Sequence, residues 1–324
     1  MQYAYLLWPH ANKRYAEGIK NALCAELELI LRKSGVSSPV TMSAVYGVET
    51  LNFDLEAQDE TVLSALSRFS HGFWLVKKEG EGFIPVSGNA EAAVGSDLPY
   101  ILKYKGKTNE RFTELLINLC LIASDFGFSD KLTFLDPMCS KGTALFEALN
   151  RGWNALGVDM DKKDISEAGD YFKKYLEEAR IKHTKKTSSQ TIEKQAPVQI
   201  TEFTLPGQTL KFACADSALT KKIFPKTPVN LIAADLPYGV QHGPGGSVSF
   251  EKMLNSVLPA WKSCLVPGGA IALAFNTHTL PRDKVRSIMA GEGLTVMEGG
   301  AWDNMSHWVE QAIVRDVAVC KKEK

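Results

Sequence analysis

The chain has 324 residues, and its 37 basic side chains balance 37 acidic ones. This length fits about two domains. The neutral charge excludes a histone-like polycation and an acidic tail protein, but not an enzyme with a local basic face. The longest apolar stretches, such as 115–123, are far shorter than a membrane span, and the start of the chain lacks a basic leader. We therefore expect no membrane partner. The six cysteines lie far apart and form no CxxC pair, so we expect no metal site and free thiols in a reducing, cytoplasmic setting.

The first 100 residues predict a small α/β domain of mixed order. We expect a strand over 3–8, a helix over 15–33 with apolar residues at helical spacing, a helix over 61–69 and a strand over 72–76. Acidic residues slightly outnumber basic ones in this segment, so its charge does not mark it as an electrostatic clamp.

Residues 101–324 predict a second, larger domain. From about residue 129 onward, apolar runs alternate with amphipathic helical patterns. This alternation predicts a doubly wound, Rossmann-like α/β sheet whose parallel strands are covered on both faces. The expected strands are 131–135, 154–158, 210–214, 229–234, 270–275, 294–297 and 308–319, and the expected helices are 112–122, 143–150, 162–179, 250–264 and 282–289.

The pattern stops between residues 181 and 199. This stretch includes the run His183–Gln190, which is polar and has no large apolar side chain. We interpret it as a mobile surface insertion between the second helix and the third strand of the larger domain.

Four predicted strands run into an aspartate: Asp136, Asp159, Asp216 and Asp235. Ligands of open α/β sheets bind outside the carboxyl ends of the strands. One such aspartate could be a helix cap or a turn residue. Four in succession, each after a buried run, indicate a ligand site.

The first of these strands runs into a turn of small residues, 136–143, and then into a helix. The turn is neither a P-loop nor a GxGxxG motif. It suits a ligand with a carboxylate end, such as the methionine part of S-adenosylmethionine. Asp159 is placed to accept both ribose hydroxyls, and Asp216 to accept from the adenine amine. The predicted cofactor-binding residues are Asp136, Pro137, Met138, Cys139, Ser140, Gly142, Thr143, Asp159, Met160, Asp216 and Ser217.

The fourth strand ends in Asp235-Leu236-Pro237-Tyr238. This segment resembles the [DN]-P-P-[YF] motif of methyltransferases that act on exocyclic amines of nucleobases or on amide nitrogens. The resemblance implies that Asp235 and a backbone carbonyl beside Pro237 accept the two amine hydrogens. It also implies that Tyr238 stacks on a target base turned out of its helix. We therefore predict that Asp235, Leu236, Pro237 and Tyr238 form the catalytic segment.

Three blocks of the chain closely resemble one RNA methylase family, which includes tRNA guanosine 2-amino methyltransferases. Asp136–Thr143 is similar to its D-P-M-C-G-S-G-T block, 235–240 to its D-[PL]-P-[YF]-G block, and 104–108 to the segment before its first strand. The resemblance covers about residues 100–320. It implies a seven-stranded class I methyltransferase sheet with an antiparallel last strand, S-adenosylmethionine as cofactor, and RNA, most simply tRNA, as partner. It also adds Thr108 to the cofactor-binding set.

The chain departs from this family in two places. Ser140-Lys141 replaces the usual Gly-Ser, and a serine there is strained if its φ is positive. Residues 1–100 are too few for the complete THUMP arrangement that often precedes the catalytic domain. Whether residues 1–100 position RNA therefore stays open. Whether the enzyme requires a small activating subunit stays open as well.

Three alternative hypotheses stand beside guanosine methylation: methylation of DNA adenine, methylation of protein glutamine, and a non-catalytic module that binds the cofactor. The same clamp serves DNA adenine and protein glutamine, and a module without catalysis could keep the cofactor pocket. His242 lies in a loop that we expect to shape the substrate entrance, with catalysis as the alternative. For the aromatic group Trp302, His307 and Trp308, core packing is favoured over substrate contact.

Overall fold

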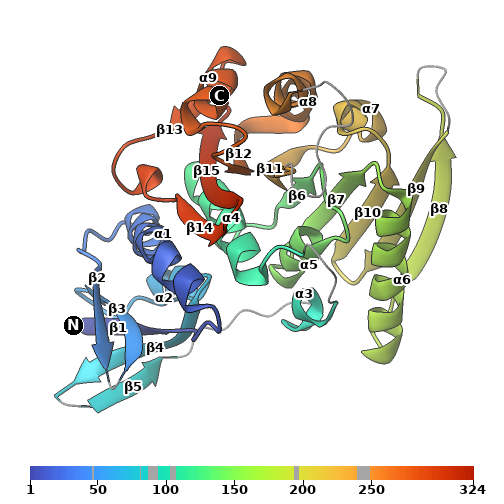
Figure 1. Cartoon of the computed structure of the whole chain (residues 1–324). Coiled ribbons are helices and arrows are strands. Elements are labelled where there is room, and N and C mark those ends of the chain that lie inside the picture. The colour runs from blue at the N-terminus through green and yellow to red at the C-terminus, as the bar shows by residue number, and fades with distance from the viewer. Residues whose placement is uncertain (46, 81, 87–93, 103–106, 193–196, 239–248) are drawn as a thin grey trace.

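The computed structural model describes residues 1–45, 47–80, 82–86, 94–102, 107–192, 197–238 and 249–324. Within these ranges the chain forms two sheets surrounded by helices (Figure 1). The His242 prediction and most of the segment 104–108 lie outside the described residues.

The first sheet is antiparallel and has the order β2-β3-β1-β4-β5. Its strands are β1 (Gln2–Leu7), β2 (Thr41–Val45), β3 (Val48–Asp54), β4 (Gly72–Glu79) and β5 (Gly82–Val86). Two helices accompany it, α1 (Lys13–Lys33) and α2 (Glu60–Leu66). Helix α1 begins where the Asn12 side chain accepts from the backbone N–H of Tyr15 at 3.1 Å, which satisfies one of the free donors at the helix start.

The second sheet has the order β13-β15-β12-β11-β6-β7-β10-β9-β8, with β14 paired to β15. The strands from β10 to β12 in this order are parallel, and β15 runs antiparallel to β12. The predicted doubly wound sheet with an antiparallel last strand is therefore confirmed. Its central strands are β6 (Thr133–Asp136), β7 (Asn154–Asp159), β10 (Gln208–Cys214), β11 (Val229–Asp235), β12 (Leu265–Asn276) and β15 (Ile313–Lys321), and β13 (Thr295–Met297) lies at one edge.

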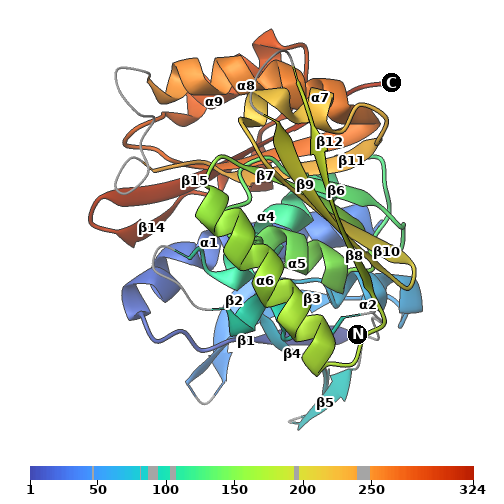
Figure 2. The same ribbon diagram turned by 90° about the vertical axis from the view of Figure 1, so that its right-hand side faces the viewer.

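Helices cover both faces of this second sheet (Figure 2). The helices α4 (Glu110–Ala123), α5 (Thr143–Asn150) and α6 (Lys162–Glu178) pack on one face, and α7 (Thr220–Ile223), α8 (Phe250–Cys264) and α9 (Arg282–Gly291) on the other. Neighbouring strand residues alternate between the two cores, so that Phe134 faces the first and Leu135 the second. The short helix α3 (Leu98–Ile101) precedes α4. None of the helices in the described ranges is long and apolar enough to cross a bilayer.

The small sheet and the large sheet share one hydrophobic core. Helix α1 packs on α4 and on β14 (His307–Glu310), and buried side chains from 3 to 319 belong to a single cluster. A buried polar network crosses the same border, since the Glu26 carboxylate accepts from Asn118 Nδ2 at 2.6 Å. Asn118 Oδ1 in turn accepts from Arg151 at 2.7 Å. The predicted division at residue 100 therefore falls within a continuously packed molecule.

The structure differs from the irregular insertion predicted over 181–199. Strand β8 (Thr184–Gln190) pairs with β9 (Val198–Leu205), which pairs with β10, so the stretch extends the sheet at its edge. Every β8 side chain from Thr184 to Ser189 is exposed. The strand therefore lacks the alternation of apolar and polar residues that predicts a strand. It is defined by backbone hydrogen bonds to β9, which the residue pattern does not indicate. Likewise, the strand expected over 308–319 is a hairpin of β14 and β15.

Candidate active site

Three of the predicted aspartates converge at one edge of the second sheet. Asp136, Asp159 and Asp235 are the last residues of the neighbouring parallel strands β6, β7 and β11, and Asp216 follows β10 closely. Burial raises the pKa of the Asp136 carboxyl to about 8, and the charges of Asp159 and Asp235 add to the increase. The carboxyl ends of the strands thus concentrate acidic groups where an open α/β sheet binds its ligand.

A tight turn joins β6 to α5. The Asp136 side chain accepts from the Met138 N–H at 3.0 Å, and the N–H of Gly142 donates to the Cys139 carbonyl at 2.7 Å. Gly142 has a φ of +86°, and Ser140 a φ of +43°. A serine in this region is strained. Its backbone N–H donates to Asp159 Oδ2 and its hydroxyl to Asp164 Oδ2, both at 2.8 Å, and these bonds offset the strain.

The turn packs tightly on the strand behind it. A Cβ added at Gly157 would lie 2.4 Å from Leu145 Cδ1 and 2.8 Å from Cys139 Sγ. The missing side chain at Gly157 therefore lets the turn lie against β7. Pro137 and Thr143 are also buried here. Lys141 pairs with Glu167 on α6, so its ammonium is directed to an acidic helix.

Asp159 is fixed by the backbone. Its Oδ2 accepts from Ser140 and its Oδ1 from the N–H of Asp161 at 2.9 Å. Each carboxylate oxygen retains further acceptor capacity, which suits a pair of ribose hydroxyls. The next residue, Met160, is 73% exposed, an unusual exposure for a large apolar side chain. These residues fit S-adenosylmethionine. The fixed carboxylate can accept from the ribose hydroxyls, the glycine-containing turn lets a ligand approach the backbone, and the exposed apolar side chain can pack on the cofactor.

The last two predicted contacts of the cofactor, Asp216 and Ser217, separate in the structure. Asp216 is exposed, and its carboxylate accepts from the Ala218 N–H at 2.8 Å. Ser217 is buried, and its hydroxyl oxygen accepts from Trp261 Nε1 at 3.0 Å. The Ser217 hydroxyl is thus directed into the core, a contact that sequence spacing does not reveal.

The clamp segment follows β11. The N–H of Leu236 donates to the Ala274 carbonyl at 2.9 Å, so the segment leaves the sheet still bound to β12. Both oxygens of Asp235 accept hydroxyls of the chain itself, Oδ2 from Thr108 and Oδ1 from Tyr238. The Thr108 hydroxyl thus lies on the clamp, and the Tyr238 hydroxyl points inward to Asp235.

Arg315 lies behind the clamp and was not predicted. It is 4% exposed, its Nε donates to the Tyr238 hydroxyl at 2.6 Å, and its guanidinium lies 4.1 Å from the centre of the Phe112 ring. The signal in the sequence is the charged pair Arg315-Asp316 within an otherwise apolar run, since charged side chains are rarely buried without partners. Burial raises the pKa of Tyr238 well above its usual value, so this hydroxyl stays protonated and can donate to Asp235.

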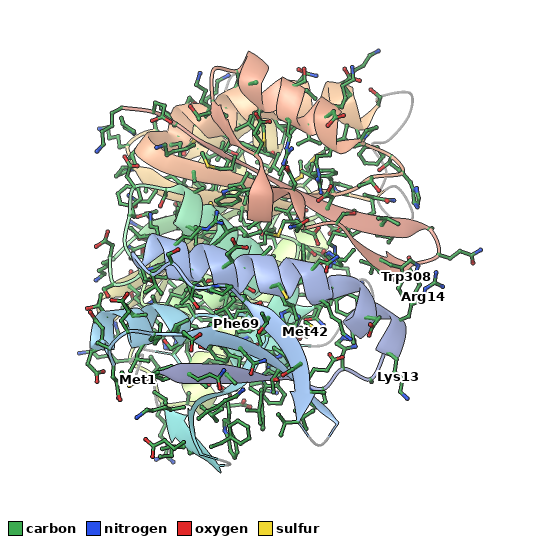
Figure 3. The ribbon with its side chains drawn as sticks, turned by 90° about the vertical axis from the view of Figure 1, so that its left-hand side faces the viewer. Met1, Lys13, Arg14, Met42, Phe69 and Trp308 are labelled. Atoms are coloured by element: carbon green, nitrogen blue, oxygen red, sulfur yellow. The ribbon has the colours of Figure 1, made fainter. Side chains whose placement is uncertain are left out.

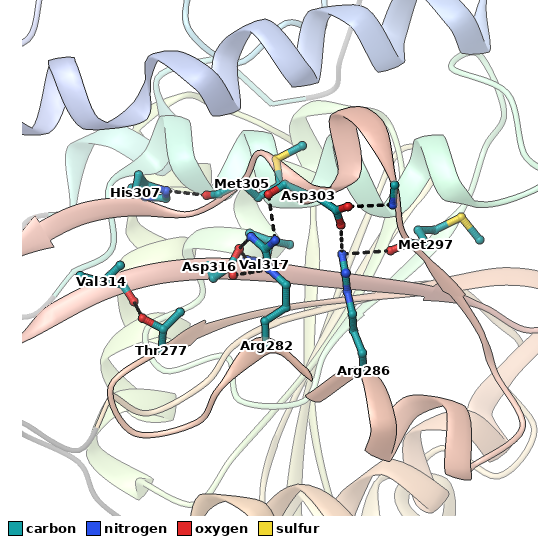
Figure 4. Close-up of polar contacts among 11 residues, drawn as sticks. Thr277, Arg282, Arg286, Met297, Asp303, Met305, His307, Val314, Asp316 and Val317 are labelled. Carbon is teal, nitrogen blue, oxygen red and sulfur yellow. Dashed lines mark hydrogen bonds and ion pairs between the residues drawn. The ribbon is translucent and has the colours of Figure 1, made fainter. Parts of the chain in front are cut away.

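Figure 4 shows polar contacts of Val314 and Asp316, the residues on either side of Arg315 in the sequence. The neighbouring Asp316 is buried and accepts from Arg282 through both carboxylate oxygens, at 2.6 and 2.8 Å. His307 is buried as predicted for the core, and its Nδ1 contacts the Met305 carbonyl at 2.9 Å. Burial, and then the charge of Arg315, lower the pKa of His307 to about 4. Among the described residues, no group of three or more His, Cys, Asp or Glu could hold a metal ion.

The sheet order, the turn after the first strand and the acidic strand ends define a class I methyltransferase, with S-adenosylmethionine as its cofactor. The sequence profile described as "RMKL-like, methyltransferase domain" matches residues 119–299, more than half of the chain, and the chain belongs to this family. The family resemblance seen in the sequence is thereby confirmed.

No curated protein matches the sequence. Several solved structures are similar in fold. TrmN from Thermus thermophilus is 16% identical with a TM-score of 0.44, over 90% of this chain and 64% of TrmN, so the chain spans less than two thirds of that protein. Magnesium protoporphyrin IX methyltransferase from Synechocystis PCC 6803 is 10% identical with a TM-score of 0.43, over 68% and 87% of the two chains. A methyltransferase from Agrobacterium tumefaciens is 17% identical with a TM-score of 0.40, over 67% and 64%. Scores this low carry no argument about substrate.

Proposed function

We propose that this chain is an S-adenosylmethionine-dependent N-methyltransferase of RNA that acts on the exocyclic 2-amino group of a guanosine in tRNA. The observation that carries the proposal is the segment Asp235–Tyr238 at the end of β11, on the same sheet edge as the turn 136–143. The resemblance of these two segments to an RNA methylase family supports RNA over the other amine substrates.

S-adenosylmethionine supplies an electrophilic methyl group on a sulfonium when it is bound. The acceptor nitrogen then needs orientation more than it needs a strong base. An amine with two hydrogens requires two acceptors, and Asp235 together with the carbonyl of Leu236 provides them. In such a transfer the nitrogen would gain a bond to the methyl carbon as the carbon–sulfur bond breaks, and sulfur would keep that electron pair as a neutral thioether. The nitrogen would lose one proton, and Asp235 is the carboxylate placed to receive it.

The hydroxyls on Asp235 occupy positions that an amine hydrogen would take. Tyr238 donates to Oδ1, and an amine that binds there replaces this phenol. A released Tyr238 ring is then available to stack on the target base, as the motif implies. Arg315 Nε keeps its acceptor as long as it stays bonded to the Tyr238 oxygen, whereas the displaced Tyr238 O–H loses its acceptor on Asp235 and has to find a new one in the complex.

The test offers RNA, duplex DNA and protein fractions together with methyl-labelled cofactor to the full chain. We expect label in RNA, and nucleoside analysis should recover N2-methylguanosine from tRNA. The Asp235→Ala variant should remove the label, while Asp170→Ala, a change of an exposed aspartate on α6, should not. Label found only in DNA or protein would overturn the proposal, and label in a different nucleoside would overturn the guanosine assignment.

A further inference from the structure

Three exposed aromatic rings form a contiguous group on the small sheet. Trp8, Phe73 and Trp74 are 40%, 42% and 55% exposed. The ring centres of Trp8 and Phe73 lie 4.4 Å apart, and those of Phe73 and Trp74 lie 5.3 Å apart with only 16° between the ring planes. We call these three residues the aromatic ladder. A group of this kind on a protein surface marks an interaction site.

The backbone arranges these rings by an irregularity in the sheet. Neighbouring residues of a regular strand point to opposite faces, yet Phe73 and Trp74 stack on each other. The register between β1 and β4 shifts between Leu6 and Leu7, opposite Trp74 and Gly72. Such bulges redirect side chains and are common beside functional sites. The ladder is therefore a built feature of the fold.

A guanidinium completes the ladder. Arg111 lies 4.2 Å from the centre of the Trp8 ring and 5.6 Å from that of Tyr100, and its Nη1 donates to the Ser70 carbonyl at 3.1 Å. Within the described part of the chain, Arg111 forms no ion pair with a carboxylate. The planar cation is thus held against an indole with its charge available to an anionic partner.

Helix α4 connects the ladder to the clamp. Thr108, which donates to Asp235, and Arg111, which covers Trp8, lie three residues apart at the start of this helix. Asn109 lies between them and caps the helix by accepting from the Arg111 N–H at 2.9 Å. Only the N-cap residue and the first residue of the helix therefore separate the backbone that holds the proposed reacting group from the backbone that holds the ladder.

A second cation–aromatic pair joins the start of helix α1 to strand β14. The Arg14 guanidinium is 4.1 Å from the centre of the Trp308 ring, and Lys13 is exposed next to it (Figure 3). Tyr15 and His307, the neighbours of this pair in sequence, pack against each other with ring centres 5.8 Å apart. Two cation–aromatic pairs therefore flank the buried side chains that surround Arg315.

We propose that the aromatic ladder and Arg111 bind unpaired nucleotides of the RNA that flank the target nucleotide. This inference rests on the proposed function and names the surface that holds its substrate. Flat rings stack on any base, and an arginine adds attraction for the phosphate and the base face. Since acidic residues outnumber basic ones in the first 100 residues, stacking rather than general charge has to supply the affinity of this domain.

The experiment measures how tightly the full chain binds an unpaired RNA oligonucleotide and its fully paired duplex. Trp8→Ala and Trp74→Ala should each weaken binding of the unpaired RNA roughly tenfold, since each removes a ring on which one base stacks. Trp8→Phe should retain most of the affinity. Phe83→Ala, which removes a 38% exposed ring on β5 outside the ladder, should change nothing. Cofactor affinity should be unchanged in all four variants, which separates lost stacking from lost folding.

Methylation kinetics separate this inference from the proposed function. The ladder variants should raise KM for RNA with little change in kcat. If wild-type enzyme methylates RNA and the ladder variants keep both their RNA affinity and their KM, the ladder inference is wrong and the function stands. If wild-type enzyme labels only DNA or protein, the function is wrong, and the ladder inference falls with it unless the oligonucleotide still binds through these rings. A change in oligomeric state without a change in RNA affinity would assign the ladder to a second copy of the chain and overturn the inference.

Discussion

The Tyr238 hydroxyl donates to Asp235 and at the same time accepts from Arg315 at 2.6 Å. One phenol therefore links the carboxylate at the end of β11 to a buried guanidinium on β15. A buried arginine without such partners would be costly. The link explains why an apolar strand carries a cation, and it makes the orientation of Asp235 depend on residues far away in the sequence.

The first prediction concerns Asp235. Asp235→Ala should lower kcat by about a hundredfold or more, since misplacing a reacting atom by about 1 Å has an effect of that size. Cofactor affinity should change little, because the contacts of the turn at 136–143 and of Asp159 are kept. Calorimetry with S-adenosylmethionine and single-turnover methylation check both parts. Activity that persists in the variant would rule out the clamp.

The second prediction concerns Tyr238. Tyr238→Phe keeps the ring, so its kcat should exceed that of Tyr238→Ala. Its stability should nevertheless fall by about 1–3 kcal/mol, because Arg315 loses the acceptor of its Nε inside the protein. Chemical denaturation gives the stability and methylation gives the rates. A Phe variant as stable as wild type would show that Arg315 finds another acceptor.

The third prediction concerns the cofactor pocket. Asp159→Ala should weaken S-adenosylmethionine by about 2 kcal/mol, the size of lost charge-assisted hydrogen bonds. The change also removes the acceptor of the Ser140 N–H, so the turn should loosen. Asp170→Ala serves as the control. Unchanged affinity by calorimetry would exclude Asp159 from the site.

The sequence predicted the parts of the fold that depend on apolar periodicity. The alternating strands and helices from β6 to β12, including a helix that contains Pro259, were found because each buries an apolar face. Strand β8 was missed because its side chains are exposed and only its backbone bonds define it. Arg315 was missed because its partner Tyr238 is 77 residues away. Contacts of that span follow from strand order, which local patterns do not encode.

The fourth prediction concerns the close packing behind the turn. Gly157→Ala places a methyl group 2.4 Å from Leu145 Cδ1, so stability should fall by about 1–3 kcal/mol and cofactor affinity should fall with it. Gly169→Ala is the matched control, since a Cβ there meets nothing within 4 Å on helix α6. That variant should be as stable as wild type or more stable by about 0.5–1 kcal/mol. Thermal unfolding with and without cofactor distinguishes the two effects. Equal behaviour of both variants would contradict the packing argument.

The last prediction concerns pH and the border between the two sheets. Burial raises the pKa of the Glu26 carboxyl from 4.5 to about 7, against the hydrogen bonds from Ser70 and Asn118 that lower it. Between these two values the folded chain holds a proton that the unfolded chain has lost. The contribution of Glu26 to the free energy of unfolding is therefore fully present below about pH 4.5. It is lost as the pH rises from there through about 7, at up to about 1.4 kcal/mol per pH unit.

The Glu26→Gln variant isolates this effect from the other buried carboxyls. Glutamine keeps the shape and the acceptor for Asn118 but does not titrate, so the charge that burial disfavours never forms. Relative to wild type, the variant should gain stability as the pH rises from 5 to 8, and the gain should level off above that range. Denaturation of both proteins at several pH values gives the difference directly, and the contributions of Asp136 and Glu114 cancel because both proteins retain them. A difference that stays constant with pH would show that Glu26 is ionised throughout, which would require the Arg151 charge beyond Asn118 to compensate for its burial.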